Sequence, residues 1–192
     1  MAESLLERRR VVAALLSDPG DMLIISGLGS TTYDVAAAGD RPLNFYLWGA
    51  MGSAAMLGLG LALAQPSRRV LVLTGDGEAL MGLGALATIA AAAPANLAIA
   101  VLDNACYGET GAQVSHTALG TDLAAAAAAC GWRASATVNR ESELEALRLR
   151  LRSEPLFAVV KIAATEAERV LPSRDGVFLQ QRFRAALGIV QD

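Results

Sequence analysis

The sequence predicts an α/β fold in which a doubly wound parallel sheet is flanked by helices. Apolar runs at residues 70–74 and 97–102 predict two buried strands, and each run ends in a polar turn. Segments with helical patterning alternate with the strands along the chain. Helical crossovers join parallel strands in this order, and such sheets bind their ligands at the carboxyl ends of the strands.

The first half of the chain follows this alternation. Charged and apolar residues at helical spacing predict a helix at 4–16, and an apolar run predicts a strand at 22–26. Glycines and hydroxyl residues predict a loop at 27–32. Small and apolar residues predict helices at 51–64 and 78–92, which we expect to pack against the sheet or another subunit.

The second half continues in the same way. After a loop at 105–118, the expected elements are an alanine-rich helix at 121–130, a short strand near Thr137, a helix at 141–151, a strand at 157–162 and an amphipathic helix at 175–187. Because no linker, repeat or change of composition interrupts the pattern, we expect a single domain over residues 1–192.

Composition excludes several classes of partner. The chain has 192 residues and a formal net charge of −3, so it does not attract nucleic acid or an anionic membrane surface. Its two cysteines, Cys106 and Cys130, form no disulfide framework, and residues 1–10 lack the apolar stretch of a signal peptide. The single His116 excludes a site of several histidines. We therefore expect a cytoplasmic protein.

Two uncharged stretches, 42–67 and 79–102, are long enough to span a membrane. Polar residues and glycines interrupt the first stretch, while Pro94 and Asn96 interrupt the second. We therefore expect no membrane-spanning segment.

Polar side chains follow both central strands. Gly75-Asp76-Gly77 closes the run at 70–74, and Asn104 closes the run at 97–102. A glycine turn that opens a helix directs backbone N–H groups at an anion, while carboxylate and amide oxygens suit Mg²⁺ better than zinc. Because neighbouring parallel strands end at the same edge, we expect a diphosphate cofactor held through a divalent cation there.

These residues, with Tyr107 after Asn104, resemble the cofactor-binding motif of thiamine diphosphate enzymes. The interval between Gly77 and Asn104 fits that motif, although the family usually has a second Asn where this chain has Asp103. The resemblance implies a thiamine diphosphate-binding fold of the diphosphate-binding type, with Mg²⁺ bound by the side chains of Asp76 and Asn104 and the backbone carbonyl of Cys106. The other residues expected at the cofactor are Ser30, Thr31, Gly75, Gly77, Glu78, Ala79 and Tyr107.

A second match to this family lies upstream, at Gly49-Ala50-Met51-Gly52. A bulky apolar side chain at the position of Met51 holds the cofactor bent in this family, so that its aminopyrimidine lies against the reactive thiazolium carbon. The resemblance implies that the Gly49 carbonyl and the Met51 N–H orient the pyrimidine.

Among split thiamine diphosphate enzymes, the chain most resembles the β subunit of sulfopyruvate decarboxylase and the matching half of phosphonopyruvate decarboxylase. The similar runs are 44–52, 75–89, 103–113 and, more weakly, 182–187. This implies nonoxidative decarboxylation of a 2-oxo acid, either 3-sulfopyruvate or phosphonopyruvate. His116 is a candidate proton donor or anion contact, and Arg41 is a candidate contact for the anionic group of the substrate.

The family also needs a glutamate that faces the pyrimidine, and it normally lies on a separate pyrimidine-binding domain. We therefore expect a partner α-type subunit, in a hetero-oligomer that contains a β dimer or a higher oligomer. The alternatives are a component of another split enzyme (transketolase-like, acetolactate-forming or oxo-acid oxidoreductase) and a noncatalytic cofactor-binding subunit. The absence of cysteine pairs for an iron–sulfur cluster argues against a ferredoxin-linked component.

Overall fold

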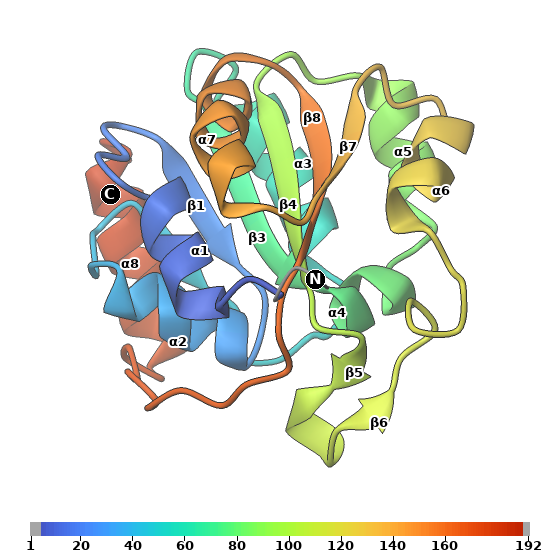
Figure 1. Ribbon diagram of the computed structural model, residues 1–192. Coiled ribbons are helices and arrows are strands. Elements are labelled where there is room, and N and C mark those ends of the chain that lie inside the picture. Colours follow the sequence, from blue (N-terminus) through green and yellow to red (C-terminus); the bar gives the residue numbers. More distant parts are fainter. Residues whose placement is uncertain (1–4, 190–192) are drawn as a thin grey trace.

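A computed structural model describes residues 5–189 and contains one six-stranded parallel sheet (Figure 1). The spatial order is β2-β1-β3-β4-β8-β7. The strands are β1 (Leu23–Ser26), β2 (Asn44–Tyr46), β3 (Val70–Gly75), β4 (Leu97–Asp103), β7 (Ser135–Val138) and β8 (Leu156–Lys161). The predicted doubly wound parallel sheet is confirmed.

Helices cover both faces of the sheet. They are α1 (Arg8–Leu15), α2 (Ser30–Ala37), α3 (Ala54–Ala64), α4 (Asp76–Met81), α5 (Ala85–Ala92), α6 (Leu123–Ala129), α7 (Leu144–Ser153) and α8 (Gly176–Ala186). Helices α1, α2 and α7 pack on one face, and α3, α5 and α6 pack on the other. In Figure 1, α1 and α7 lie in front of the sheet and α3 lies behind it, while α8 packs along the edge strand β2.

The alternation within β3 explains why its sequence is apolar throughout. Leu71 and Leu73 point to the cluster under α1 and α7, whereas Val70 and Val72 point to the cluster under α3 and α5. All four are fully buried. A central parallel strand is covered on both faces, so both sets of side chains must be apolar.

Several predicted elements differ from those observed. Residues 30–37 form helix α2 and residues 44–46 form strand β2, neither of which was expected. The helix expected at 4–16 begins only at Arg8, because the Glu7 carboxylate caps it by accepting bonds from the Arg9 and Arg10 N–H groups; position 4 lies outside the described residues.

The helix expected at 78–92 is two helices, α4 and α5. The chain breaks near Gly82 because it passes directly over Gly52, where a Cβ on Gly82 would lie 2.3 Å from the Gly52 carbonyl oxygen. The expected loop at 105–118 contains a short antiparallel hairpin of β5 (Cys106–Tyr107) and β6 (Gln113–Val114), with a 3₁₀ turn at Gly108–Thr110 between them.

The strand order creates a switch point between β1 and β3. After β1 the chain moves outward to β2 and then returns to the other side of β1 to form β3. Loops that leave the two strands in opposite directions open a crevice at their carboxyl ends. Figure 1 shows the β5–β6 hairpin projecting beyond this edge of the sheet. Within residues 5–189, no helix has the length and apolar character needed to cross a membrane.

Candidate functional site

A pocket opens at the carboxyl ends of β1, β3 and β4. It lies between the loop that leads into α2, the turn that opens α4 and the β5–β6 hairpin. The predicted cofactor and metal residues that line it are Ser30, Thr31, Met51, Gly75, Asp76, Gly77, Glu78, Asn104, Cys106 and Tyr107. Residues that are distant in the sequence therefore meet at the edge of the sheet where the strand-end motifs predicted a ligand.

Four other predicted residues do not line this pocket. Gly49 is exposed on the turn before Met51, and Ala79 lines a smaller neighbouring cavity together with Glu78 and Gly52. His116 is exposed, but its Nδ1 lies 3.3 Å from the Tyr107 hydroxyl oxygen. His116 therefore reaches the pocket only through Tyr107. Arg41 also lies elsewhere, where its guanidinium donates to the backbone carbonyls of Gly20 and Met22.

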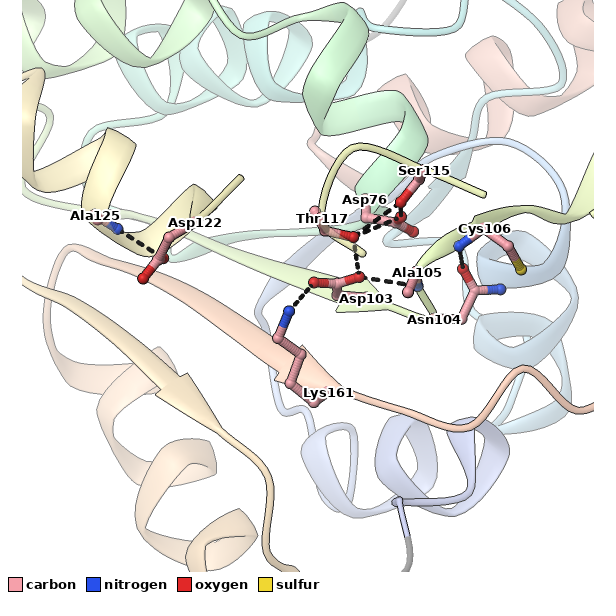
Figure 2. A network of polar contacts seen from close by, with 10 residues as sticks. All are labelled: Asp76, Asp103, Asn104, Ala105, Cys106, Ser115, Thr117, Asp122, Ala125 and Lys161. Carbon is pink, nitrogen blue, oxygen red and sulfur yellow. Dashed lines mark hydrogen bonds and ion pairs between the residues drawn. The ribbon is translucent and has the colours of Figure 1, made fainter. Parts of the chain in front are cut away.

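Asp76 is a buried carboxylate at the start of α4, and Figure 2 shows the polar network around it. The Ser115 hydroxyl donates to Asp76 Oδ2 over 2.5 Å, and the Thr117 hydroxyl lies 3.3 Å from the same oxygen. Burial raises the pKa of Asp76 and the nearby Asp103 raises it further, while the Ser115 bond lowers it. Among residues 5–189, no cationic side chain pairs with Asp76. A cation bound here would favour the charged form of this carboxyl group.

Asp103, the departure from the family motif, is directed away from the pocket. Its carboxylate accepts a bond from Lys161 Nζ at 2.5 Å, from the Thr117 hydroxyl at 2.7 Å and from the Ala105 N–H at 3.0 Å (Figure 2). Because these three donors satisfy the extra charge, Asp103 stabilises the turn that follows β4.

Asn104 and Cys106 lie on the pocket side of that turn. The Asn104 Oδ1 accepts a bond from the Cys106 N–H at 3.2 Å, which leaves a second lone pair on this oxygen. Burial raises the pKa of the Cys106 thiol, and Asp76 adds to this shift. The sulfur therefore remains protonated near neutral pH, in keeping with a role for the backbone of Cys106 rather than for its thiol.

Gly77 lies beneath two side chains that close the pocket. A Cβ at this position would lie 2.6 Å from the Tyr107 ring and 3.4 Å from Met51 Cε. By contrast, a Cβ at Gly75 would contact nothing within 4 Å. The motif therefore needs glycine at 77 for close packing, while the space around Gly75 is open to a ligand.

Glu78 connects the loops around the pocket. Its carboxylate accepts the Thr74 hydroxyl at 2.9 Å and the Ala54 N–H at 3.4 Å, and a Cβ on Gly27 would lie 1.8 Å from Glu78 Oε2. Burial raises the pKa of Glu78, whereas the bond from Thr74 lowers it. These contacts fix the loops that place Leu28 and Met51 on the pocket wall.

Several residues of the site were not expected from the sequence. Arg8 and Glu109 line the pocket, and Ser115 and Thr117 hold Asp76 from behind. The two hydroxyl residues follow the Asn104 motif closely enough to have been candidates. Arg8 comes from the other end of the chain, and no sequence pattern connects it with the motif.

A metal site at this position would rely on mixed oxygen donors. Across the described residues 5–189, no three His, Cys, Asp or Glu side chains are grouped so that they could hold a metal. The expected donors are one carboxylate, one amide oxygen and one backbone carbonyl. Such hard oxygen donors suit Mg²⁺, which keeps several of its ligands as water or phosphate oxygens.

The chain matches known families along most of its length. Residues 27–162 match the model of the thiamine pyrophosphate enzyme, C-terminal TPP binding domain. Sulfopyruvate decarboxylase subunit beta of Methanothermobacter thermautotrophicus is 37% identical over 179 residues, which cover 93% of this chain and 94% of that protein. Phosphonopyruvate decarboxylase of Streptomyces hygroscopicus is 49% identical over 116 residues, which cover 60% of this chain and 28% of that protein.

Solved structures share the fold. A putative thiamin diphosphate-dependent enzyme from Mycobacterium smegmatis superposes with a TM-score of 0.68 at 25% identity, covering 82% of this chain and 32% of that chain. Benzoylformate decarboxylase from Polynucleobacter necessarius gives a TM-score of 0.72 at 20% identity, covering 86% of this chain and 34% of that chain. The family match, the relative aligned over nearly its whole length and the pocket geometry together show that this chain belongs to the thiamine pyrophosphate enzyme family.

Proposed function

We propose that this chain is the β-type subunit of a thiamine diphosphate- and Mg²⁺-dependent 2-oxo acid decarboxylase that acts on 3-sulfopyruvate or phosphonopyruvate. The observation that carries the proposal is the convergence of Asp76, Asn104, Cys106 and Met51 on one pocket. The match to a sulfopyruvate decarboxylase β subunit over nearly the full length of both chains supports the reaction class.

The pocket fits a metal-bound diphosphate. Asp76 is buried without a cationic partner among the described side chains, and Asn104 Oδ1 keeps a free lone pair. Ser30 and Thr31 bring hydroxyl groups and the first N–H groups of α2 to the opposite wall. These residues would hold Mg²⁺ and the diphosphate, with the Cys106 carbonyl as the third protein ligand.

When bound, thiamine diphosphate supplies a carbanion that adds to the keto carbon and an electron sink for the electrons released with CO₂. The residues of this chain position that chemistry and exclude water from it. Met51 and Tyr107 meet over Gly77 and form part of the apolar wall, while the bond from Ser115 fixes the orientation of Asp76. His116 contacts the hydroxyl of Tyr107, and Tyr107 lines the pocket. We therefore propose His116 as a proton donor or anion contact.

We propose that the glutamate that activates the cofactor comes from a pyrimidine-binding α-type subunit. Two glutamates of this chain line the pocket, Glu78 and Glu109. Glu78 is engaged by Thr74 and Ala54, and Glu109 is exposed on the hairpin beside the diphosphate residues. Relatives named subunit beta support a partner chain, and we further propose a hetero-oligomer that contains a β dimer or a higher oligomer. We propose the cytoplasm as its location.

Activity of the complex tests this function. The chain would be purified with the partner that it retains, supplied with Mg²⁺ and thiamine diphosphate, and assayed for CO₂ release from 3-sulfopyruvate, phosphonopyruvate and pyruvate. We expect release from a sulfonate or phosphonate substrate that depends on the partner and is abolished by Asp76→Ala. Release from pyruvate alone would change the substrate. Cofactor binding without any release would favour carboligation, oxidation or a noncatalytic subunit.

A further inference from the structure

Arg8 reaches the rim of the cofactor pocket because the chain before α1 is attached to the end of β8. Leu6 pairs in parallel with Ile162, and the Ala163 N–H donates to the Leu6 carbonyl over 2.8 Å. Helix α1 then begins at Arg8. This anchor places Arg8 on the pocket wall beside Ser30, Asn104 and Cys106, which are residues expected at the diphosphate and the metal.

The Arg8 guanidinium is buried and only partly paired. Its side chain is 9% exposed, and its Nε donates to Asp34, whose side chain is fully buried. Arg9 also donates to Asp34, over 2.9 Å. Two guanidinium groups therefore share one carboxylate, which balances only one of their two positive charges.

Most of the donors of Arg8 have no protein acceptor. An arginine carries five N–H donors, and the bond from Nε uses one of them. Over residues 5–189, the Nη groups of Arg8 form no hydrogen bond. Neither Nη group of Arg8 belongs to the fully buried side-chain atoms that lack a partner in the described chain, so both are accessible from the pocket, where an anion can accept their hydrogen bonds.

The shape of the surrounding space indicates which part of the cofactor this anion is. A second cavity adjoins the cofactor pocket and shares Arg8, Ser30, Asn104 and Cys106 with it, but it lacks Met51, Asp76 and Gly77. Arg8 therefore lies where the two cavities meet, whereas Met51, which the family resemblance places at the ring end of the cofactor, lines only the first. The terminal phosphate is the anionic group farthest from the rings.

We propose that Arg8, held by Asp34, binds the terminal phosphate of thiamine diphosphate. This inference rests on the proposed function. Arg8 acts here as an anion-binding residue that selects the diphosphate form of the cofactor. Glu109 also lines this pocket but is exposed, and none of the ion pairs formed within the described chain joins it to Arg8. Its carboxylate therefore forms no direct ion pair with the guanidinium.

The test compares the affinities of the purified complex for thiamine diphosphate and for thiamine monophosphate, with Mg²⁺ present, by isothermal titration calorimetry. A charge-assisted hydrogen bond predicts that Arg8→Met weakens diphosphate binding by about ten- to a hundredfold, with little change for the monophosphate. Arg9→Met is the matched control, because Arg9 also pairs with Asp34 but lines only the adjoining cavity and not the cofactor pocket. We expect it to preserve the ratio of the two affinities.

The outcomes separate this proposal from the proposed function. If the wild-type complex does not bind thiamine diphosphate, both are overturned. If the wild type binds and Arg8→Met leaves the ratio unchanged, only the role of Arg8 is overturned. The role of Arg8 is also overturned if Arg8→Met raises the KM for the oxo acid but not the Kd for thiamine diphosphate, since Arg8 would then bind the substrate.

A second variant covers the case in which Arg8→Met does not fold. Arg8→Lys keeps the charge beside Asp34 but lacks the planar fork of donors that serves two anions at once. We expect it to fold, as judged by its unfolding temperature, and to lower the diphosphate-to-monophosphate affinity ratio at least threefold. An unchanged ratio in Arg8→Lys would overturn the proposal.

Discussion

At the scale of single residues, Gly77 shows why the turn after β3 needs glycine at one position and not at both. The Tyr107 ring and Met51 Cε occupy the space where a side chain at 77 would begin, whereas the space at Gly75 is open. We expect Gly77→Ala to destabilise the metal-free protein by about 1–3 kcal/mol through overpacking, and Gly75→Ala to change stability by less than about 0.5 kcal/mol.

Urea unfolding of the two variants, followed by circular dichroism, measures this difference. Gly75→Ala is a matched control because the two residues lie in the same turn. Equal stability of both variants would mean that Tyr107 does not pack over Gly77.

The stability of the folded protein should depend on pH through the carboxyl group of Asp76, and a bound metal ion should oppose this dependence. Because burial raises its pKa above the ordinary value of 3.8, the folded state retains a proton that the unfolded state loses. The contribution of Asp76 to stability therefore falls as the pH rises from about 3.8 through the raised pKa, and it stays at its lower level above that pKa. A bound cation favours the carboxylate, so saturating Mg²⁺ should oppose this fall.

The comparison is between wild type and Asp76→Asn, with unfolding temperatures measured from pH 4 to pH 8 in EDTA and in Mg²⁺. Glu78 also has a raised pKa, but it is present in both proteins, so its contribution cancels in the difference. We expect the wild type to lose more stability than Asp76→Asn as the pH rises in EDTA, and only the wild type to be stabilised by Mg²⁺. Parallel curves under both conditions would contradict the role of Asp76.

The site residues that could be predicted from the sequence are those that lie directly at the end of a strand. Asp76 and Asn104 follow apolar runs directly, so the parallel sheet alone brings them together. Arg8 and Thr117 enter the site through tertiary contacts, one through the Leu6–Ile162 bridge and the other through a loop that folds back on Asp76. No local pattern encodes the contact of Arg8, whereas Thr117 lies in the loop that follows Asn104 and was within reach of a sequence argument.

At the scale of elements, helix α3 contains two glycines with opposite surroundings. A Cβ on Gly58 would lie 2.3 Å from Val72 Cγ2 on the fully buried β3, while a Cβ on the exposed Gly60 would contact nothing within 4 Å. Gly58 therefore allows α3 to approach the sheet closely. Gly60 serves no such purpose within this chain.

This difference predicts stability changes of opposite sign in one helix. Gly60→Ala should stabilise the chain by about 0.5–1 kcal/mol through helix propensity, whereas Gly58→Ala should destabilise it by about 1–3 kcal/mol because Val72 cannot move away. Chemical denaturation of the isolated chain gives both values. A stabilising Gly58→Ala would show that α3 does not pack closely on Val72.

Sequence patterns predicted the central elements better than the peripheral ones, for a physical reason. Strands β3 and β4 are buried on both faces, so burial imposes an apolar run on each. Helix α2 was not predicted because it buries Thr31, Thr32 and Asp34, whose polar groups obscure the apolar periodicity of a helix. The break between α4 and α5 depends on the contact of Gly82 with Gly52, which sequence spacing does not show.

At the scale of the whole molecule, one surface lacks the polar side chains of an ordinary solvent-exposed face. Helix α3 carries no charged residue, and α3 contacts α5. The exposed large apolar side chains on α3, α4 and the turn before α5 are Met56, Leu57, Leu63, Met81 and Leu83. This surface adjoins the cofactor pocket because α4 begins at Asp76 and ends at Met81. A partner that completes the cofactor site must approach close to this pocket, so we expect it to cover this surface.

A lysine placed at Met81 should therefore weaken assembly with the partner by at least about tenfold, because the interface would have to bury an unpaired charge. The matched control is Leu149→Lys, since Leu149 is 53% exposed on α7, on the opposite face of the sheet, while Met81 is 62% exposed. Copurification with the partner and light scattering measure assembly, and unfolding temperatures confirm that both variants fold. If Leu149→Lys disrupts the complex and Met81→Lys does not, the partner binds the α7 face, and the uncharged surface of α3 and α4 requires another explanation.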